Sequence, residues 1–321
     1  SEKAYAAIPK ILGADVDVLF CNMTTYATSS VFAPIIKAVN KPVVLAALQP
    51  AKCLDYKNAC TLMQLENDNI CAVPEFTGVA VRMNRRVNDV ILGCLYGDED
   101  ADAEIAEWCD IAKVLNSLSG ARLGLMGHVL ESMYDMHADP TAISNAFGVH
   151  VPLLEIDDAA ELFKTVTEEE TEKKIEVIKA EFDMPDPVSD PVTRKLTRED
   201  LYQSAKTAAA LDKLVEKYNL TGLAYYYEGA EASLRRQVAQ SFIVGNSILN
   251  AQGIPMCGEF DIKTLIAMLI MDRLDIGGSF AEFHPFDFRE EFILVGHYGP
   301  HHLRVAEGKP VLRSLTKFHG K

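Results

Sequence analysis

The sequence lacks any hydrophobic run long enough to cross a membrane. Residues 264–271 form one of its longest largely apolar stretches, far shorter than the roughly 20 residues that a membrane helix needs. The seven cysteines are scattered along the chain and include no C-x-x-C pair. An odd, unclustered set of cysteines is typical of reduced thiols rather than of a disulfide framework or a zinc site. These absences predict a cytoplasmic protein that does not span a membrane.

The sequence also lacks the motifs and the charge that several common binding functions require. It has no G-x-G-x-x-G, P-loop or G-x-S-x-G segment, so nucleotide binding and serine-hydrolase chemistry have no support. Its 31 basic side chains are outnumbered by 46 acidic ones, which gives a net charge of −15. A chain this acidic is poorly suited to phosphate backbones or anionic lipid surfaces. We therefore expect neither nucleic acid nor a membrane as a partner.

Short apolar runs alternate with longer helical patterns through most of the sequence. The expected strands are 16–21, 43–47, 90–96, 122–126 and 223–227. The expected helices are 30–39, 101–118, 197–218 and 234–251. The apolar runs do not alternate with polar residues, which is typical of strands buried on both faces of a parallel sheet. The pattern predicts an α/β fold with Rossmann-like parallel-sheet domains.

Changes in the sequence pattern divide the chain into three expected domains. A long helix ends near Gly120 and a new strand follows, which predicts an N-terminal α/β domain at 1–119 and a central one at 120–276. From 277 to 321 no long helical pattern occurs, and we expect the start of a β-rich C-terminal domain. The proline-containing segment 183–190 is expected to be a surface excursion. The chain opens without methionine and ends in an unfinished pattern, so we expect truncation at both ends.

The last quarter of the chain holds the densest group of chemically versatile side chains. Five of the eight histidines lie after position 280, and Glu259 and Glu282 are lone carboxylates flanked by glycine and apolar residues. Burying such carboxylates without a cation is costly, so a shared metal ion would stabilise them. With the imidazole of His297, which follows the apolar run 292–296, they would suit Mn²⁺ or Mg²⁺.

The segments around these three residues resemble the motifs of the L-arabinose isomerase and L-fucose isomerase family. Residues 258–264 read GEFDIKT, residues 277–288 read GGSFAEFHPFDF, and residues 294–297 read LVGH. The corresponding stretches of L-arabinose isomerases read roughly GEGDWKT, GTSFMEDYTYH and LGxH. The resemblance implies that Glu259, Glu282 and His297 are metal ligands and that the two glutamates are also the catalytic acid/base pair. The family's fourth ligand is a histidine that lies beyond the stretch matched here.

The same resemblance implies an activity and an assembly. It implies a metal-dependent interconversion of an aldose and a ketose through an enediol, of the L-arabinose to L-ribulose type. It also implies a fucose isomerase-like fold, a divalent cofactor for which Mn²⁺ is the expected ion, and a homo-oligomer, either trimer or hexamer. This sequence departs from the family at Ile262, where the family has tryptophan, and at 283–287, where FHPFD replaces DYTYH.

Five further residues are candidate sugar contacts, and each has a structural alternative. Glu228 follows an apolar strand and could instead stabilise the N-terminus of the next helix. Lys263 could support Glu259 or be a solvated lysine, and His284 could touch sugar or lie on the surface. Asn67 corresponds to a segment that reaches a neighbour's active site in the family, or it is a loop asparagine. His128 follows a strand, where pocket residues often lie, or it begins a helix.

Other functions stay open at the level of the residues. L-fucose or another aldose would suit the same chemistry, and a lyase or epimerase could use a similar enediol. A non-catalytic sugar-binding protein would share the α/β alternation and bind sugar without metal. His301 and His302 could hold a second metal ion, although we expect a solvent-exposed pair at a sheet edge.

Overall fold

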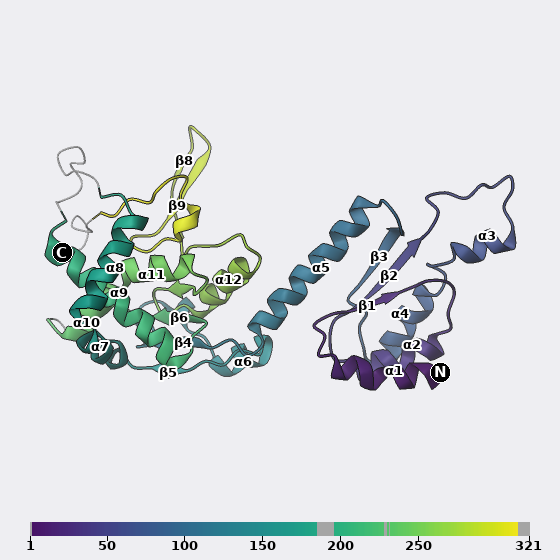
Figure 1. Ribbon diagram of the computed structural model, residues 1–321, viewed down its shortest axis with the longest axis horizontal. Helices are drawn as coiled ribbons and strands as arrows, with labels where there is room; N and C mark the ends of the chain where they lie inside the picture. The colour runs from purple at the N-terminus through teal and green to yellow at the C-terminus, as the bar shows by residue number, and fades with distance from the viewer. Residues whose placement is uncertain (1, 185–195, 228–229, 231, 314–321) are drawn as a thin grey trace. The chain divides into compact units, whose positions relative to one another are not determined.

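The computed structural model describes residues 2–184, 196–227, 230 and 232–313 (Figure 1). It is an α/β structure with parallel sheets, as the alternation of apolar runs and helical patterns predicts. The chain divides into two compact units, Ser1–Asn116 (unit 1) and Ser117–Lys321 (unit 2). The division places residues from 277 onward in unit 2, and the three-domain organisation stays a prediction. None of the described helices combines the length and apolar character needed to cross a membrane.

Unit 1 is built on a three-stranded parallel sheet. Its strands, in spatial order, are β1 (Leu19–Asn22), β2 (Val43–Gln49) and β3 (Asp89–Cys94). Its helices are α1 (Glu2–Gly13), α2 (Ser29–Ala38), α3 (Thr61–Glu66), α4 (Val73–Arg82) and α5 (Glu99–Leu118), the last of which ends in unit 2. Asp98 fixes the start of α5, because its carboxylate accepts hydrogen bonds from the backbone N–H groups of Cys94 (2.7 Å) and Ala101 (3.2 Å).

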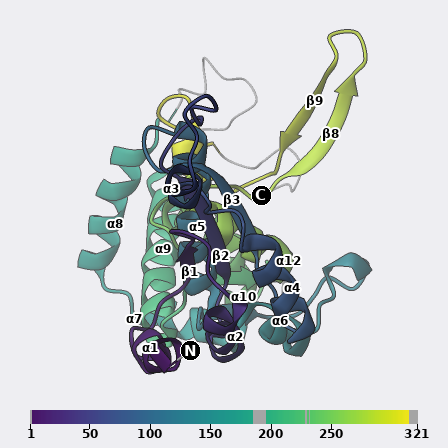
Figure 2. The same ribbon diagram turned by 90° about the vertical axis from the view of Figure 1, so that its right-hand side faces the viewer.

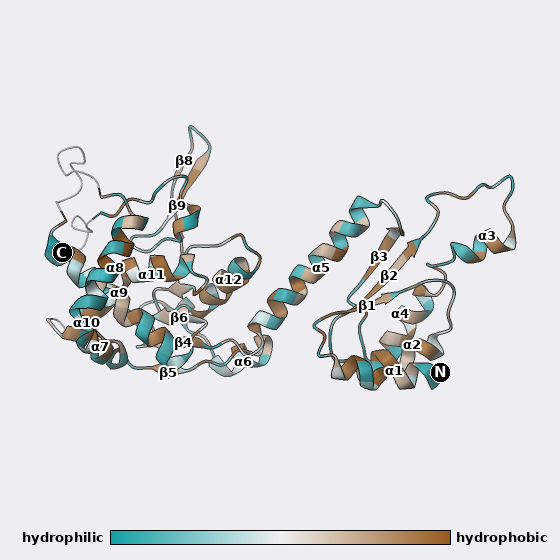
Figure 3. Ribbon diagram, in the orientation of Figure 1, coloured by the Kyte–Doolittle hydropathy of each residue, from teal (hydrophilic) through white to brown (hydrophobic). Residues whose placement is uncertain are grey.

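Successive residues of β2 point to opposite faces of this sheet, and the buried side chains on each face pack against helices. Val43, Leu45 and Ala47 belong to one buried cluster with side chains of α2 and α4. Val44 belongs to a second cluster, with Ala101 of α5. Figure 3 shows the corresponding pattern, with hydrophobic residues along β2 and β3 and mixed hydropathy along α5.

Unit 2 contains a four-stranded parallel sheet and a separate antiparallel hairpin. The sheet strands, in spatial order, are β5 (Leu153–Leu154), β4 (Leu123–Met126), β6 (Gly222–Tyr225) and β7 (Met256–Cys257). The hairpin consists of β8 (Glu282–Asp287) and β9 (Phe292–Gly296). The α-helices are α6 (Pro140–Phe147), α7 (Ile156–Thr165), α8 (Glu168–Glu181), α9 (Arg198–Tyr218), α10 (Leu234–Gln240), α11 (Phe242–Ala251) and α12 (Ile262–Arg273). Two short 3₁₀ helices cover Tyr134–Met136 and Leu303–Val305.

The strand order of unit 2 creates a switch in chain direction beside β4. From β4 the chain moves to β5 on one side, and then to β6 and β7 on the other side. In open parallel sheets, ligands bind outside the carboxyl ends of the strands at such a switch. The carboxyl edge of β4, β6 and β7 is therefore the part of unit 2 where a site is expected on topology alone.

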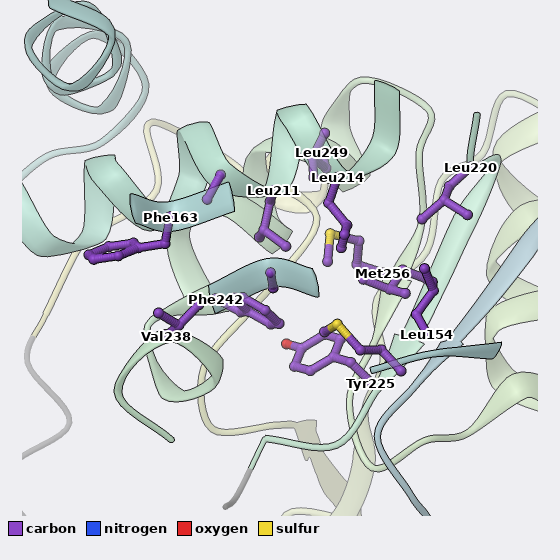
Figure 4. Packing of buried hydrophobic residues seen from close by; sticks show 14 of the residues in the cluster. Leu154, Phe163, Leu211, Leu214, Leu220, Tyr225, Val238, Phe242, Leu249 and Met256 are labelled. Atoms are coloured by element: carbon purple, nitrogen blue, oxygen red, sulfur yellow. The ribbon is translucent and has the colours of Figure 1, made fainter. Parts of the chain in front are cut away.

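The core of unit 2 lies between the sheet and helices α7, α9, α10 and α11. Figure 4 shows Phe242 beside Tyr225, and their rings meet edge to face with centroids 5.0 Å apart. Phe242 and Leu214 are fully buried, and burying a side chain of this size contributes about 1.5–3 kcal/mol. Helix α12 covers the other face, where Leu265 packs so closely on Gly222 that a Cβ there would lie 3.2 Å from its Cδ1 atom.

Most expected elements are present within a few residues of their predicted bounds, but one long helix is not. The single helix predicted across 234–251 is wrong, because α10 and α11 are separated at Ser241 (φ −91°, ψ 7°). The hydroxyl group of Ser241 donates a hydrogen bond to the carbonyl oxygen of Gln237 (2.7 Å), an interaction that often bends helices. Most of the predicted excursion at 183–190 lies outside the described residues.

Candidate metal centre

Glu259 lies at the carboxyl edge of the unit 2 sheet, directly after β7 and Gly258. The N–H group of Phe260 donates a hydrogen bond to the carbonyl oxygen of Tyr225 at the end of β6 (3.0 Å). Glu259 and Phe260 both have left-handed backbone, with φ of 58° and 64°. This conformation costs a non-glycine residue roughly 1–2 kcal/mol. The surrounding structure therefore holds Glu259 in a turn that its own backbone disfavours.

Asp261 fixes the position at which this turn becomes helix α12. Its carboxylate accepts hydrogen bonds from the backbone N–H groups of Lys263 (3.0 Å) and Thr264 (3.1 Å) and from the Thr264 hydroxyl group (2.6 Å). An aspartate at this position satisfies N–H groups that have no partner within the helix. Glu259 is thus placed between two fixed points, the end of β6 and the start of α12.

The other two residues of the predicted ligand set lie at the open end of the β8–β9 hairpin. Glu282 is the first residue of β8, and His297 directly follows Gly296, the last residue of β9. Antiparallel pairing places Glu282 opposite Gly296, so the pairing register brings Glu282 and His297 together. Strand β9 coincides with the apolar run 292–296, whereas no pattern in the sequence predicts β8 or its pairing with β9.

Glu259, Glu282 and His297 converge into one group that could hold a metal ion. One ligand atom from each residue lies within 4.8 Å of the other two. Glu259 is buried, with 7% of its surface exposed, whereas His297 is half-buried and Glu282 is exposed. Ligand atoms at 2.0–2.2 Å from a shared ion can be separated by at most about 4.4 Å. Only two of the three ligand atoms can lie opposite each other across an ion, so the group would have to contract from the 4.8 Å limit to bind an ion directly.

The polar atoms of this group fit a cation. Oε2 of Glu259 and Nδ1 of His297 are buried, and neither has a hydrogen-bond partner among the described residues. A buried polar atom without a partner costs about 1–3 kcal/mol, and a charged one costs more. A divalent ion would satisfy the carboxylate, and a set of two carboxylates and one imidazole suits borderline to hard metals.

The two glutamates raise the pKa of the His297 imidazole above its usual value. Glu259 has the largest effect, burial opposes it, and the negative charge of Glu282 adds to it. Nε2 of His297 lies 3.9 Å from Oε1 of Glu259, which is longer than a hydrogen bond. We therefore treat the interaction as charge attraction across a short gap.

Two of the predicted sugar contacts lie near this group and have structural partners. The amino group of Lys263 donates a hydrogen bond to the backbone carbonyl oxygen of Asp135, which ties the segment after β4 to the start of α12. The Nε2 atom of His284 lies 3.1 Å from the carbonyl oxygen of Gly296, a contact within the hairpin. Both residues belong to the neighbourhood of the candidate site, while their contact with a sugar stays a prediction.

The other three predicted sugar contacts are His128, Asn67 and Glu228. His128 follows β4 and is exposed, and its ring lies against Tyr226 with centroids 4.2 Å apart. Asn67 belongs to unit 1, beside a surface hollow of about 850 Å³. Its side-chain oxygen accepts a hydrogen bond from the N–H group of Ala51, and its amide nitrogen donates one to the carbonyl oxygen of Met63. Its amide therefore has a structural role in shaping that loop. Glu228 lies outside the described residues.

The two adjacent histidines after the hairpin differ from the expected exposed pair. His301 is exposed, and its Nε2 atom lies 3.0 Å from the carbonyl oxygen of His297. His302 is only 4% exposed, and its Nδ1 atom accepts a hydrogen bond from the N–H group of Arg304 (3.2 Å). Burial, together with the Arg304 charge, lowers the pKa of His302. The expectation of a solvent-exposed pair is therefore wrong for His302.

The sequence did not single out one residue that shapes the candidate site. Phe280 is 6% exposed, and its ring packs edge-on against the His297 imidazole with centroids 4.7 Å apart. This contact limits the orientations of the imidazole. The signal available in the sequence was its place in GGSFAE, two residues before Glu282.

No family model matches the chain, and no curated protein matches its sequence.

Proposed function

We propose that this protein is a divalent-metal-dependent isomerase that interconverts an aldose and a ketose, of the L-arabinose or L-fucose isomerase type. The convergence of Glu259, Glu282 and His297 is the single observation that supports this proposal most. The motif resemblance selects these three residues from three separate stretches of the chain. Residues chosen by motif alone have no reason to meet in space unless the motifs belong to one site.

The chemistry of the proposed reaction matches the groups at this site. A bound divalent ion would act as a Lewis acid toward the oxygens of the open-chain sugar. One carboxylate of the Glu259–Glu282 pair would take the proton from C2 of the aldose and return it to C1, while the proton of the C2 hydroxyl group moves to the oxygen on C1, which yields the ketose. A positioned carboxylate of this kind contributes about 10²–10⁴-fold to the rate. Glu259 is held between β6 and α12, so its carboxylate meets the sugar in a fixed position.

The test is a panel of aldoses, including L-arabinose and L-fucose, incubated with the protein and Mn²⁺ and assayed for ketose. We expect turnover of at least one aldose, loss of turnover with chelator, and loss in Glu259→Gln. Glu290→Gln is the matched control, because Glu290 is an exposed acid near the hairpin turn and its loss should leave turnover unchanged. Absence of turnover on every aldose, with metal binding intact, would refute the isomerase proposal.

Two further outcomes of the same panel would identify a different function. Exchange of deuterium at C2 without ketose formation would indicate an epimerase or lyase. Sugar binding that persists in Glu259→Gln and needs no metal would indicate a sugar-binding protein.

The resemblance also leads us to propose a fucose isomerase-like fold, Mn²⁺ as the preferred ion, and a trimer or hexamer. The scattered cysteines lead us to propose a cytoplasmic location. Light scattering measures the mass of the protein in solution, and a mass equal to one chain would refute the proposed trimer or hexamer. Calorimetric titration with Mn²⁺, Mg²⁺ and Zn²⁺ ranks the ions.

A further inference from the structure

The β8–β9 hairpin has almost no core of its own. Phe283 is 79% exposed, Phe288 is 89% exposed, and Leu294 and Val295 are also exposed. Among the described elements, β8 and β9 make their only extensive contact with each other. Both ribbon views show the hairpin projecting away from the helices of unit 2 (Figures 1 and 2). A two-stranded hairpin without further packing is marginally stable at best in water.

Few contacts of the described residues attach this hairpin to the body of unit 2. Phe280, just before β8, is buried, and its ring supports the His297 imidazole. The hydroxyl oxygen of Ser279 accepts a hydrogen bond from the N–H group of His302 (2.7 Å). Nε2 of His297 approaches Oε1 of Glu259 at 3.9 Å. These contacts involve only the base of the hairpin, and none involves the exposed side chains of its strands.

We infer that binding of a divalent metal ion docks the β8–β9 hairpin onto the body of unit 2. The ligand residues are divided between the two parts, since Glu259 belongs to the body, whereas Glu282 and His297 belong to the hairpin base. An ion that needs all three residues binds only when the hairpin is docked. It therefore stabilises the docked state over the undocked one. The inference rests on the proposed metal site and is independent of the proposed sugar reaction.

The size of the effect follows from this linkage. At a free metal concentration of about 100 times Kd, the docked state gains a factor of about 100 over the undocked state. Hydrogen exchange of backbone amides that requires undocking should slow by up to the same factor. Amides near the turn of the hairpin, which can fray without undocking, should slow less.

The experiment is hydrogen–deuterium exchange of the full chain, read by mass spectrometry with chelator and with increasing Mn²⁺. Peptides covering 282–297 should exchange at least 10-fold more slowly at saturating Mn²⁺. Peptides covering β2 in unit 1 serve as an internal control and should not change. Glu259→Gln removes the ligand on the body and leaves the hairpin sequence intact, so it should abolish the effect. Glu290→Gln should retain the slower exchange at saturating Mn²⁺.

The outcomes separate this inference from the metal site on which it rests. If calorimetry shows stoichiometric Mn²⁺ binding and exchange over 282–297 stays unchanged, the docking inference is refuted and the metal site stands. If wild-type protein binds no divalent ion, both are refuted. If Glu259→Gln does not fold, the titration of wild-type protein tests the docking inference by itself. The inference requires that protection of the hairpin amides rises in proportion to the free metal concentration above Kd.

Discussion

Because two carboxylates lie close together at the candidate site, removing one of them should have opposite effects on the stability of the metal-free and the metal-bound protein. Glu259 and Glu282 offer ligand atoms within 4.8 Å of each other. Two like charges at that distance repel by about 0.9 kcal/mol in bulk water and by about 3.5 kcal/mol at an effective dielectric constant of 20. Glu282 is exposed, so solvent screening favours the lower end of this range. We expect a repulsion of about 1 kcal/mol at a pH where His297 is neutral.

Replacing Glu282 by glutamine should therefore stabilise the metal-free protein. At pH 9 with chelator, we expect Glu282→Gln to raise the Tm of unit 2 by about 2–4 °C, the usual shift for 1 kcal/mol at this size. With saturating Mn²⁺ at pH 7.5, wild type should instead have the higher Tm. At about 100 times Kd the wild type gains about 2.7 kcal/mol. The variant gains less, because losing even a group outside the ligand set weakens metal affinity about 10–100-fold.

Differential scanning calorimetry under the two conditions measures both effects. Glu290→Gln removes the same charge from the same hairpin, away from the three-residue group, and should shift neither transition appreciably. If Glu282→Gln lowers the Tm in chelator, the two carboxylates do not repel and the convergence is wrong. If Mn²⁺ raises the Tm of variant and wild type equally, Glu282 is not a ligand.

Three other variants test the fold of unit 2. Phe242→Ala should lower the free energy of unfolding in urea by about 3–5 kcal/mol, because it empties a fully buried position. Gly245→Ala should destabilise by about 1–3 kcal/mol despite its better helix propensity, since the new Cβ would lie 2.9 Å from Cα of Ala208. Hydrogen bonding with Lys213, the largest cause, lowers the pKa of Glu170 from 4.5 to about 2. A lowered folded-state pKa contributes stability above pH 4.5 that is lost as the pH falls toward 2, so Glu170→Gln should have a lower Tm than wild type at pH 7 and the same Tm near pH 2.

Much of the fold could be predicted because buried parallel strands leave a strong signal. The predicted strand 43–47 is apolar on both faces and lies within β2 (Val43–Gln49), which directly follows Pro42 and directly precedes Pro50. The helix predicted at 197–218 likewise begins within one residue of α9, where Thr197 and Asp200 form a capping box. Strand β7 was missed because two residues, Met256–Cys257, are too short to show a pattern. The break at Ser241 was missed because neither glycine nor proline marks it.

The sequence identified the members of the candidate metal centre but not how they are held. Motif resemblance selected Glu259, Glu282 and His297, which the structure brings together. The left-handed turn at Glu259 and Phe260 could not be expected, because such backbone is normally predicted at glycine. Nor could the isolation of the β8–β9 hairpin be predicted. Its aromatic residues are typical of a buried strand, and only tertiary structure shows that they are exposed.

Two unfavourable features occur at the same point of the chain, and a structural role alone explains neither. Glu259 has strained backbone, and its Oε2 atom is buried without a hydrogen-bond partner among the described residues. Glycine at 259 would remove both costs and keep the turn that joins β7 to α12, since glycine adopts positive φ freely. Strain of this kind is concentrated where the surrounding structure fixes a side chain for binding or catalysis. The coincidence of both costs with a nearby carboxylate and imidazole therefore supports a ligand role for Glu259 over a packing role.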